Sequence, residues 1–571
     1  MLKQSRHVEP GHARAWLSAG SLAVLIAILM ACLVIAQAVP SIIRCRDVFP
    51  SYDMVDVVYR YFIGPPIDFW IYHGNEHLPL FVMPLYWLDL NLFSAQGTFL
   101  TGCMLCLAVA IGLAPFPASL RAHKPDLLMP FALGLTGAAM NVWLGGYTNL
   151  VWTHQVQMYV SLYAVMVAIG LAARDRPRRL RHLAGMAACL VVATFSFGYG
   201  IIGFPVLLAL GLLRRWNWRR LAFLATVLVV CLAVYIALNA PSLARGVARG
   251  LAFESLYYIA VFALTFVASP PYNLLRQFLP DSTAYAVAWC AGGAGVAVYI
   301  WHIVHCRWKP PSEYCSWAIA LGLFTMLVAA ETAYARAFFG YQAAADGRYI
   351  VGQLPFWLGL LLLAARPSTA ATSRARPILV VALPLILALL LASQFRILPA
   401  MRAHSYGRYA AAMVAIDGVG DPSVYAIIQA LKPDRVPVII AGLKARQWSA
   451  FAWPQNKMIG KPLSSFGGNV TGCVGFVDSD IAVGDAAGRR VMGWAGDAHA
   501  TDQWILLVDG AGVVRGVGHS GGPRPDVVGA THRPDLLYAG WTGYVRRPIG
   551  DKIAAYLLVK DKHPCHIAGP Q

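Results

Sequence analysis

Charge is scarce in this chain of 571 residues: only 13% are Asp, Glu, Lys or Arg, whereas 58% are hydrophobic. The mean hydropathy of +0.57 is higher than the core of a soluble protein of this size requires. The apolar residues also occur in blocks of about twenty, the length that crosses roughly 30 Å of hydrocarbon. One large soluble domain is therefore excluded, and a polytopic α-helical membrane protein is predicted.

Acidic residues are the scarcer kind, with 27 Asp and Glu against 46 Lys and Arg and a formal net charge of +19. Such an excess can indicate nucleic-acid binding, but here much of it lies in short segments between apolar blocks, where positive residues set membrane topology. These segments are residues 174–181 and 214–220, with weaker ones at Arg121 and Lys124, at Arg307 and Lys309, and at Arg366, Arg374 and Arg376. We therefore expect them in the cytoplasm, with membrane lipid and not nucleic acid as the partner.

Cysteine is rare outside the apolar blocks. Six of the eleven cysteines lie within such blocks and are expected to be small packing residues. Cys473 and Cys565 are the only two after residue 396. If that part of the chain lies outside the cytoplasm, a disulfide between them is predicted, with two free thiols as the alternative.

The apolar blocks predict about eleven membrane-spanning helices. These are residues 16–40, 97–117, 127–144, 157–173, 183–197, 200–213, 221–239, 284–304, 317–335, 349–365 and 377–393. The first block is too long for a signal peptide, so we expect a retained helix. Residues 256–268 are interpreted as an interfacial or re-entrant helix, because another span would place the basic segment 366–376 outside. Gly198, Gly200 and Gly203 match a dinucleotide-binding pattern, but they are expected to break a membrane hairpin, with Pro205 starting the returning helix.

With the amino terminus inside, an odd number of spans divides the chain into three parts. They are a cytoplasmic tail (1–15), a transmembrane domain (16–396) with a first outer loop at 41–96, and a periplasmic C-terminal domain (397–571). The C-terminal domain begins with helical stretches and continues with short alternating runs separated by turns, which predicts a small β-sandwich within an α+β domain. The protein is thus expected in the bacterial inner membrane.

One string in the C-terminal domain, from Gly518 to Gly522, reads Gly-His-Ser-Gly-Gly and matches a nucleophile elbow. That motif requires a helix directly after it, and Pro523 and Pro525 follow instead. A loop between strands is expected.

The first outer loop carries more charged and aromatic residues than a simple connector needs. Asp53 and Asp56 lie three residues apart, on one face of a short helix predicted at 53–62, and Asp89 follows at the end of the loop. Acidic residues on this side of the membrane are candidates for acid–base chemistry.

The string His73-Gly-Asn75-Glu76-His77 places two imidazoles and a carboxylate within five residues. This arrangement would suit a divalent metal or an acid–base pair, although the spacing fits no zinc signature. The alternative is that these side chains cap and tie the loop. A metal ion therefore stays open, and no other cofactor is predicted.

Two further outer segments carry candidate binding residues. Asn149, Trp152 and Gln155 form an amide- and aromatic-rich strip of the kind that sugars favour, unless Trp152 only belongs to the interfacial aromatic belt. Arg336 and Arg348-Tyr349 lie near the outer face, where arginine is disfavoured, which indicates an anionic partner such as a lipid phosphate. Anchoring to lipid headgroups is the alternative.

These features together resemble the GT-C class of polytopic membrane glycosyltransferases, in particular uncharacterised bacterial members. The resemblance covers residues 16–396 and includes Phe195-Ser-Phe-Gly198; the sequence departs from the class pattern at Gly74 and Leu78. It implies an enzyme that transfers a hexosyl or pentosyl group from a polyprenyl-phosphate carrier to a periplasmic glycan, lipid or protein acceptor of the cell envelope. It also implies Asp53 as the catalytic base, with Glu76 second. The substrate-binding residues it implies are Asp56, His73, His77, Asp89, Asn149, Trp152, Gln155, Arg336, Arg348 and Tyr349.

Two other functions remain open. A lipid-linked glycan transporter would also need basic residues near lipid, but it should carry polar residues through the middle of several spans, where few charges are found. In a non-enzymatic envelope assembly or receptor protein, the C-terminal domain would be the functional part and the carboxylates of the first loop would be dispensable.

Overall fold

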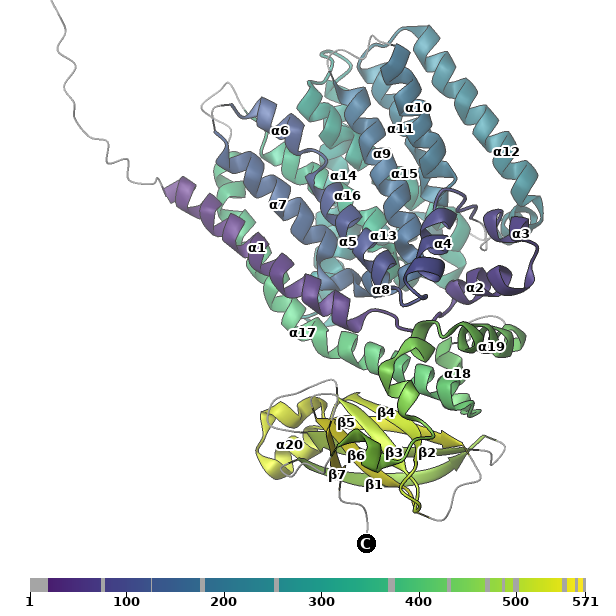
Figure 1. Cartoon of the computed structure of the whole chain (residues 1–571). Coiled ribbons are helices and arrows are strands. Elements are labelled where there is room, and N and C mark those ends of the chain that lie inside the picture. The colour runs from purple at the N-terminus through teal and green to yellow at the C-terminus, as the bar shows by residue number, and fades with distance from the viewer. Residues whose placement is uncertain are drawn as a thin grey trace, which may run out of the picture.

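The computed structural model describes residues 19–72, 77–124, 126–174, 180–250, 256–367, 375–428, 433–467, 473–484, 488–496, 503–546, 552–559 and 563–567. A bundle of apolar helices lies above a smaller domain built on a β-sheet (Figure 1). The cytoplasmic tail predicted at 1–15 lies outside the described residues.

Ten helices of the described chain are long and apolar enough to cross a membrane, and two shorter apolar helices accompany them. The helices of this part are α1 (Ala19–Cys45), α2 (Asp53–Ile63), α3 (Pro66–Trp70), α4 (Met83–Leu92), α5 (Thr98–Leu113), α6 (Phe116–Ala122), α7 (Leu128–Val142), α8 (Tyr147–Val151), α9 (Val156–Ala173), α10 (Leu180–Thr194), α11 (Gly203–Leu213), α12 (Trp218–Gly250), α13 (Leu256–Leu275), α14 (Asp281–His305), α15 (Glu313–Arg336), α16 (Ile350–Ala364) and α17 (Ala375–Asp417). The multi-pass helical architecture is thus confirmed.

The basic segments meet at one end of the bundle, here called the basic face. Arg121 pairs with Glu313 at 2.5 Å, and a ring nitrogen of His123 lies 2.9 Å from the carbonyl oxygen of Ala365. Arg215 lies on the same face and donates to the carbonyl of Arg307 at 3.4 Å. Segments far apart in the sequence therefore share one side of the bundle, as the charge pattern predicts.

The acidic and aromatic segments meet at the opposite end, here called the loop face. The backbone N–H of Asp47 donates to the carbonyl of Val151 at 3.0 Å, and that of Phe81 donates to Phe195 at 3.2 Å. The Asn149 amide donates to the Arg348 carbonyl at 2.6 Å. The first outer loop, the segment before α9 and the segment before α16 thus form one surface.

The segment predicted to be interfacial or re-entrant forms α13, a longer helix than expected and itself apolar enough to span. Its carboxyl end lies on the loop face, where Asn273 donates to the Ala345 carbonyl at 3.0 Å. Helix α14 starts at that face and α12 starts at the basic face, so the chain reaches the loop face before and after α13. The chain therefore lies at the same end of the bundle before and after α13.

The glycine-rich break between α10 and α11 forms a short 3-10 helix, Gly198–Ile202, and the returning helix begins at Gly203. A side chain at Gly200 would collide with the backbone of Ala193, so the tight return requires glycine there. This agrees with the predicted hairpin, but the returning helix starts at Gly203 and not at Pro205, where it was expected.

The C-terminal part begins with helices α18 (Pro422–Ile428) and α19 (Val436–Arg446), and α20 (Pro525–Thr531) lies between its strands. The strands are β1 (Val474–Val483), β2 (Gly488–Gly496), β3 (Trp504–Val508), β4 (Val514–Gly522), β5 (Gly540–Arg546), β6 (Ala554–Val559) and β7 (His563–Ile567). All pair antiparallel in one sheet, in the order β1-β2-β5-β4-β3-β6-β7.

The predicted β-sandwich is therefore wrong for the described strands, which form one curved sheet. Its two edges approach each other, because a disulfide joins Cys473 before β1 to Cys565 in β7, with Cα atoms 6.3 Å apart. Alternating runs fit a strand of either architecture, so the pattern could not distinguish two sheets from one. Glycines at 516, 518 and 543 lie where neighbouring backbone leaves no room for a side chain, which lets the central strands bend.

The nucleophile-like string was expected in a loop, but it lies within strand β4. Helix α20 then begins at Pro525, contrary to the expectation that no helix would start there. Proline is tolerated at the first helical position, because the N–H it lacks would have no partner within the helix.

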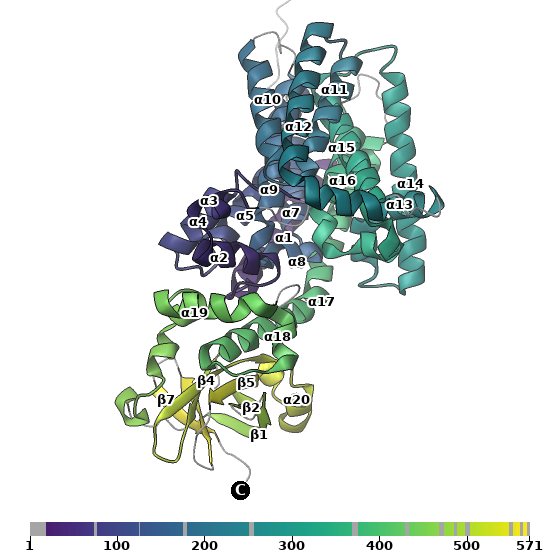
Figure 2. The ribbon, with the colours of Figure 1, turned by 90° about the vertical axis from the view of Figure 1, so that its right-hand side faces the viewer.

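Helices α18 and α19 lie between the bundle and the sheet, and α19 lies next to α2 (Figure 2). Phe62 of α2 packs against Gly442 of α19, and Arg435 pairs with Asp56 at 2.5 Å. The C-terminal part thus covers the first outer loop.

Candidate functional site

Asp53 occupies the first turn of α2, at the edge of a buried polar cluster on the loop face. Its carboxylate lies 4.0 Å from Nε2 of His154, and the Asp53 side chain is 22% exposed whereas that of His154 is 3% exposed. The Tyr86 hydroxyl donates to the His154 carbonyl at 2.8 Å and lies 3.3 Å from Nδ1 of the ring. The imidazole is therefore held in a fixed orientation beside a carboxylate that solvent can reach.

Tyr72 forms another wall of this cluster. Its hydroxyl lies 3.5 Å from the Asp53 carbonyl oxygen. Burial, followed by the carboxylates of Asp53 and Asp56, raises the pKa of Tyr72 well above its usual value. The phenol therefore stays protonated and can only act as a hydrogen-bond donor or a neutral acceptor.

A buried ion pair fixes the chain just before α2. Asp47 lies 3.3 Å from Arg408 and 3.7 Å from His404 of α17, and both Asp47 and Arg408 are almost inaccessible. The Arg408 guanidinium lies 4.7 Å from the centre of the Tyr52 ring. Removing one partner of such a pair would leave a buried charge, which is costly. Sequence reasoning missed Arg408 and His404, because they lie after the last predicted span.

His77 is half-buried and lies beside Gly198 of the loop between α10 and α11. Its ring centre is 4.1 Å from that of Phe197. Burial, then the charges of Arg336 and His154, lower the pKa of His77 to about 3. The imidazole is therefore neutral at physiological pH. Its Nδ1 atom has no hydrogen-bond partner within the described part of the chain.

Arg336 and Glu331 come from the last turns of α15 to the same region. Arg336 is close enough to His77 to affect its charge. Both His77 and Glu331 lie within 4 Å of the point that a side chain on Gly198 would occupy. Sequence reasoning missed Glu331, although a lone glutamate near the outer end of an apolar span was a usable signal.

Two other acidic residues of the predicted site, Asp56 and Asp89, make contacts away from the Asp53 cluster. Asp56 pairs with Arg435, and Asp89 is buried, with its carboxylate 3.3 Å from the Gly97 N–H. Burial raises the pKa of Asp89 to about 7, against weaker effects of the Gly97 and Leu100 N–H groups. Among the described contacts, none joins Asp89 to Asp53.

The amide- and aromatic-rich strip of Asn149, Trp152 and Gln155 lies mostly beneath the loop face and does not form an open surface there. The Asn149 side chain is occupied by the Gly347 and Arg348 carbonyls, at 3.3 and 2.6 Å. The Trp152 ring contacts the rings of Tyr52 and His154. The indole nitrogen of Trp152 and the amide oxygen of Gln155 are buried without a hydrogen-bond partner among the described residues.

Arg348 and Tyr349 lie beside a polar hollow on the loop face. Arg348 contacts Asp346 at 3.4 Å and lies 5.0 Å from the Tyr349 ring centre. The hollow has a volume of about 670 Å³. Its walls include Tyr147, Tyr272, Tyr285, Tyr341, Asn273, Arg276, Asp281 and Asp346. Its size suits a small ligand, and its tyrosine and polar groups suit a sugar.

The motif residues His73, Asn75 and Glu76 lie outside the described residues. Within the described ranges, no group of three or more His, Cys, Asp or Glu side chains could hold a metal ion.

The structure thus brings together Asp53, Trp152, His77 and Arg336 of the predicted site, and adds His154 and Glu331. Comparison with known proteins assigns the chain to no family, because no family model, no curated protein and no solved structure matches it.

Proposed function

We propose that this protein is a membrane glycosyltransferase that moves a sugar from a polyprenyl-phosphate carrier to a cell-envelope acceptor, with Asp53 as the general base. The observation that supports this most directly is the partly exposed Asp53 carboxylate beside buried His154, on the face that also carries Arg336. Glycosyl transfer requires a base for the acceptor hydroxyl and positive charge for the departing phosphate. Both kinds of group are present here.

Asp53 is the best candidate among the acids of the first loop. Asp47 is buried against Arg408, Asp56 pairs with Arg435, and Asp89 is buried. The carboxylates of Asp47 and Asp56 are already engaged by arginine, and Asp89 is buried out of reach of an incoming hydroxyl, although burial raises the pKa of its carboxyl. Asp53 instead contacts a histidine, which can stabilise its charge or share its proton.

The substrates would approach this face by different routes. A polyprenyl chain would lie among the membrane helices, with its phosphate near Arg336 at the end of α15. The orphaned polar atoms of Trp152 and Gln155 favour a polar ligand nearby, because a buried polar group without a partner costs about 1–3 kcal/mol. The tyrosine-lined hollow has room for further sugar units.

The orientation of the helix bundle in the membrane is part of the same proposal. Positive residues concentrate in cytoplasmic loops, so the basic face is assigned to the cytoplasm. The loop face, Asp53 and the sheet domain then lie on the periplasmic side of a bacterial inner membrane.

A cell-envelope glycan profile of a deletion strain tests the function. Loss of one sugar residue supports a transferase, and re-expression of the intact chain should restore it. Accumulation of a complete, cytoplasm-facing lipid-linked glycan would indicate a transporter instead, and an unchanged envelope would indicate a receptor or assembly protein.

A further inference from the structure

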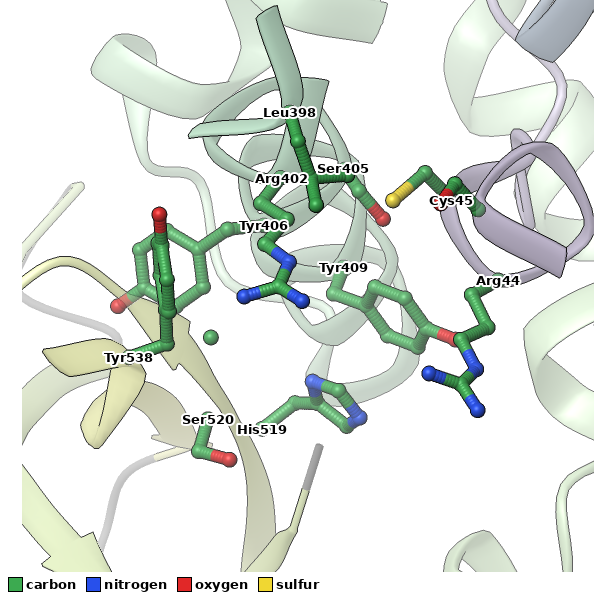
Figure 3. A pocket seen from close by; sticks show the side chains of 12 residues that line it. Arg44, Cys45, Leu398, Arg402, Ser405, Tyr406, Tyr409, His519, Ser520 and Tyr538 are labelled. Carbon is green, nitrogen blue, oxygen red and sulfur yellow. The ribbon is translucent and has the colours of Figure 1, made fainter. Parts of the chain in front are cut away.

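A second cavity lies where the membrane helices meet the sheet domain, away from Asp53. Its walls come from the end of α1, from α17 and from β4 (Figure 3). The lining residues are Ser41, Arg44, Cys45, Leu398, Arg402, Ser405, Tyr406, Tyr409, His519, Ser520, Gly521 and Tyr538. This space is called the junction cavity below.

The lining of the junction cavity contains two arginines and a histidine but no carboxylate. Arg44 and Arg402 form no ion pair with any carboxylate in the described ranges, and the guanidinium of Arg402 lies 4.6 Å from the centre of the Tyr538 ring. Other arginines of the C-terminal part do have acidic partners. Arg435, Arg489, Arg490, Arg515, Arg524 and Arg533 each pair with an aspartate. The junction cavity therefore has a positive charge that no carboxylate of its described lining neutralises.

Aromatic packing holds the walls in place. The His519 ring stacks on Tyr409 with ring centres 4.0 Å apart and contacts the edge of Trp504 at 5.0 Å. The Tyr406 hydroxyl lies 2.6 Å from the Thr542 hydroxyl of β5. Figure 3 shows Arg402 reaching between Tyr538 and Tyr409 towards His519 and Ser520, with Arg44 beyond the rings of Tyr409 and His519. The aromatic walls and Arg402, which lies against the Tyr538 ring, are thus arranged before a ligand arrives, which lowers the cost of binding.

The size and position of the junction cavity limit the kinds of ligand that it could bind. The cavity is partly open and has a volume of about 50 Å³, enough for one small anionic group. Arg44 and Arg402 follow the apolar parts of α1 and α17, whose exposed Leu29, Leu33 and Leu389 would face lipid chains. An anionic group at this level can be carried by a lipid whose chains lie beside these two helices.

We propose that the junction cavity binds the phosphate group of an anionic membrane lipid through Arg44 and Arg402. The guanidinium groups supply charge-assisted hydrogen bonds, and Ser520 and His519 complete the polar wall. A bound phosphate would join α1, α17 and β4, and so attach the sheet domain to the membrane surface. This site does not depend on the reaction proposed at Asp53.

The test uses the full chain purified in a neutral detergent and measures binding of phosphatidylglycerol, phosphatidylcholine or inorganic phosphate by native mass spectrometry and thermal unfolding. We expect phosphatidylglycerol to bind and raise the unfolding temperature, and phosphatidylcholine to do neither. Arg44→Gln with Arg402→Gln should weaken this binding about tenfold or more, because two charge-assisted hydrogen-bond donors are lost. Arg396→Gln is the matched control, since Arg396 is an exposed arginine of α17 outside the cavity.

The outcomes separate two sources of phosphate. Equal stabilisation by inorganic phosphate and by phosphatidylglycerol would keep the anion site but assign it to a free phosphate. Phosphatidylglycerol binding that is the same in the double variant and the intact chain, or absent from the intact chain, would overturn the proposal. If the double variant does not fold, Arg402→Lys and Arg44→Gln are measured singly, and unchanged binding in Arg44→Gln then overturns it.

Discussion

At the scale of single residues, environment distinguishes the acids of the first loop more clearly than sequence position does. Asp47, Asp53 and Asp56 lie within ten residues, yet their surroundings differ. Asp47 is buried against Arg408, Asp53 is partly exposed beside buried His154, and Asp56 pairs with Arg435 of the C-terminal part. Asp53 could be chosen from the sequence through resemblance. His154, which lies 4.0 Å from it, could not, because nothing local links residues 101 positions apart.

The first prediction concerns Asp53. Asp53→Asn keeps the shape of the side chain but removes its charge and its capacity to accept a proton. Turnover of a polyprenyl-phosphate sugar in reconstituted membranes should fall by ~10²-fold or more, while donor binding persists. Asp68→Asn is the matched control, because Asp68 is an exposed acid of the same loop. Full activity in Asp53→Asn would place the base elsewhere.

The second prediction concerns the buried carboxyl of Asp89. Its pKa is raised from 3.8 to about 7 in the folded chain. The folded state therefore binds the proton more tightly than the unfolded state, so the free energy of unfolding falls as pH rises from about 4 to 7. Asp89→Asn should unfold at a higher temperature than the intact chain at pH 8, by the equivalent of a few kcal/mol at most. The difference should shrink at pH 5.

Thermal unfolding of both proteins across this pH range provides the measurement. Asp68→Asn, at an exposed acid of the same loop, serves again as the control. A variant that is equally destabilised at every pH would mean that the Asp89 hydrogen bond matters more than its burial.

At the scale of secondary structure, the existence of a helix was easier to predict than the residue at which it ends or the elements against which it packs. The short helix predicted at 53–62 is observed as Asp53–Ile63. The last span was predicted to end at 393, but α17 continues to Asp417 with Pro399 inside it. The apolar signal stops at the membrane boundary, whereas the helix continues because its later turns pack on the sheet domain. For the same reason, Arg408 could not be assigned to the site from sequence.

The third prediction concerns the contact between α2 and α19. Arg435→Gln should loosen α19 from α2, because it removes the 2.5 Å pair with Asp56 and the contact of Arg435 with the Tyr59 ring. The pair is partly buried, so we expect a loss of about 1 kcal/mol. Faster hydrogen exchange in both helices would show it.

A double-mutant cycle with Asp56→Asn isolates the pair, since the second substitution should add little once the first is made. Additive effects of the two substitutions would contradict a direct interaction.

At the scale of the whole molecule, the positions of positive residues predicted the grouping of segments correctly. Segments around Arg121, Arg215 and Arg307 meet at one end, and the acidic loop meets Asn149 and Arg348 at the other. The curved single sheet could not be predicted, because strand order and closure depend on pairings between distant segments.

The fourth prediction concerns sidedness. The basic face is assigned to the cytoplasm, and α17 carries the chain from that face to the sheet domain. Alkaline phosphatase fused after Gln571 should therefore be active, and a fusion in the segment 306–312 should be inactive. The reverse pattern would invert the orientation and remove the periplasmic setting of the proposed reaction.

Helix α17 is continuous over 43 residues and belongs to both parts of the molecule. Near its end, Arg408 holds Asp47 just before α2, while Tyr406 is joined to strand β5. Because both attachments lie on one helix after Pro399, a tilt of the sheet domain that moves the end of α17 would also move Asp47 and, with it, the first turn of α2. A movement of the sheet domain would in this way reach Asp53 without any loop having to fold or unfold.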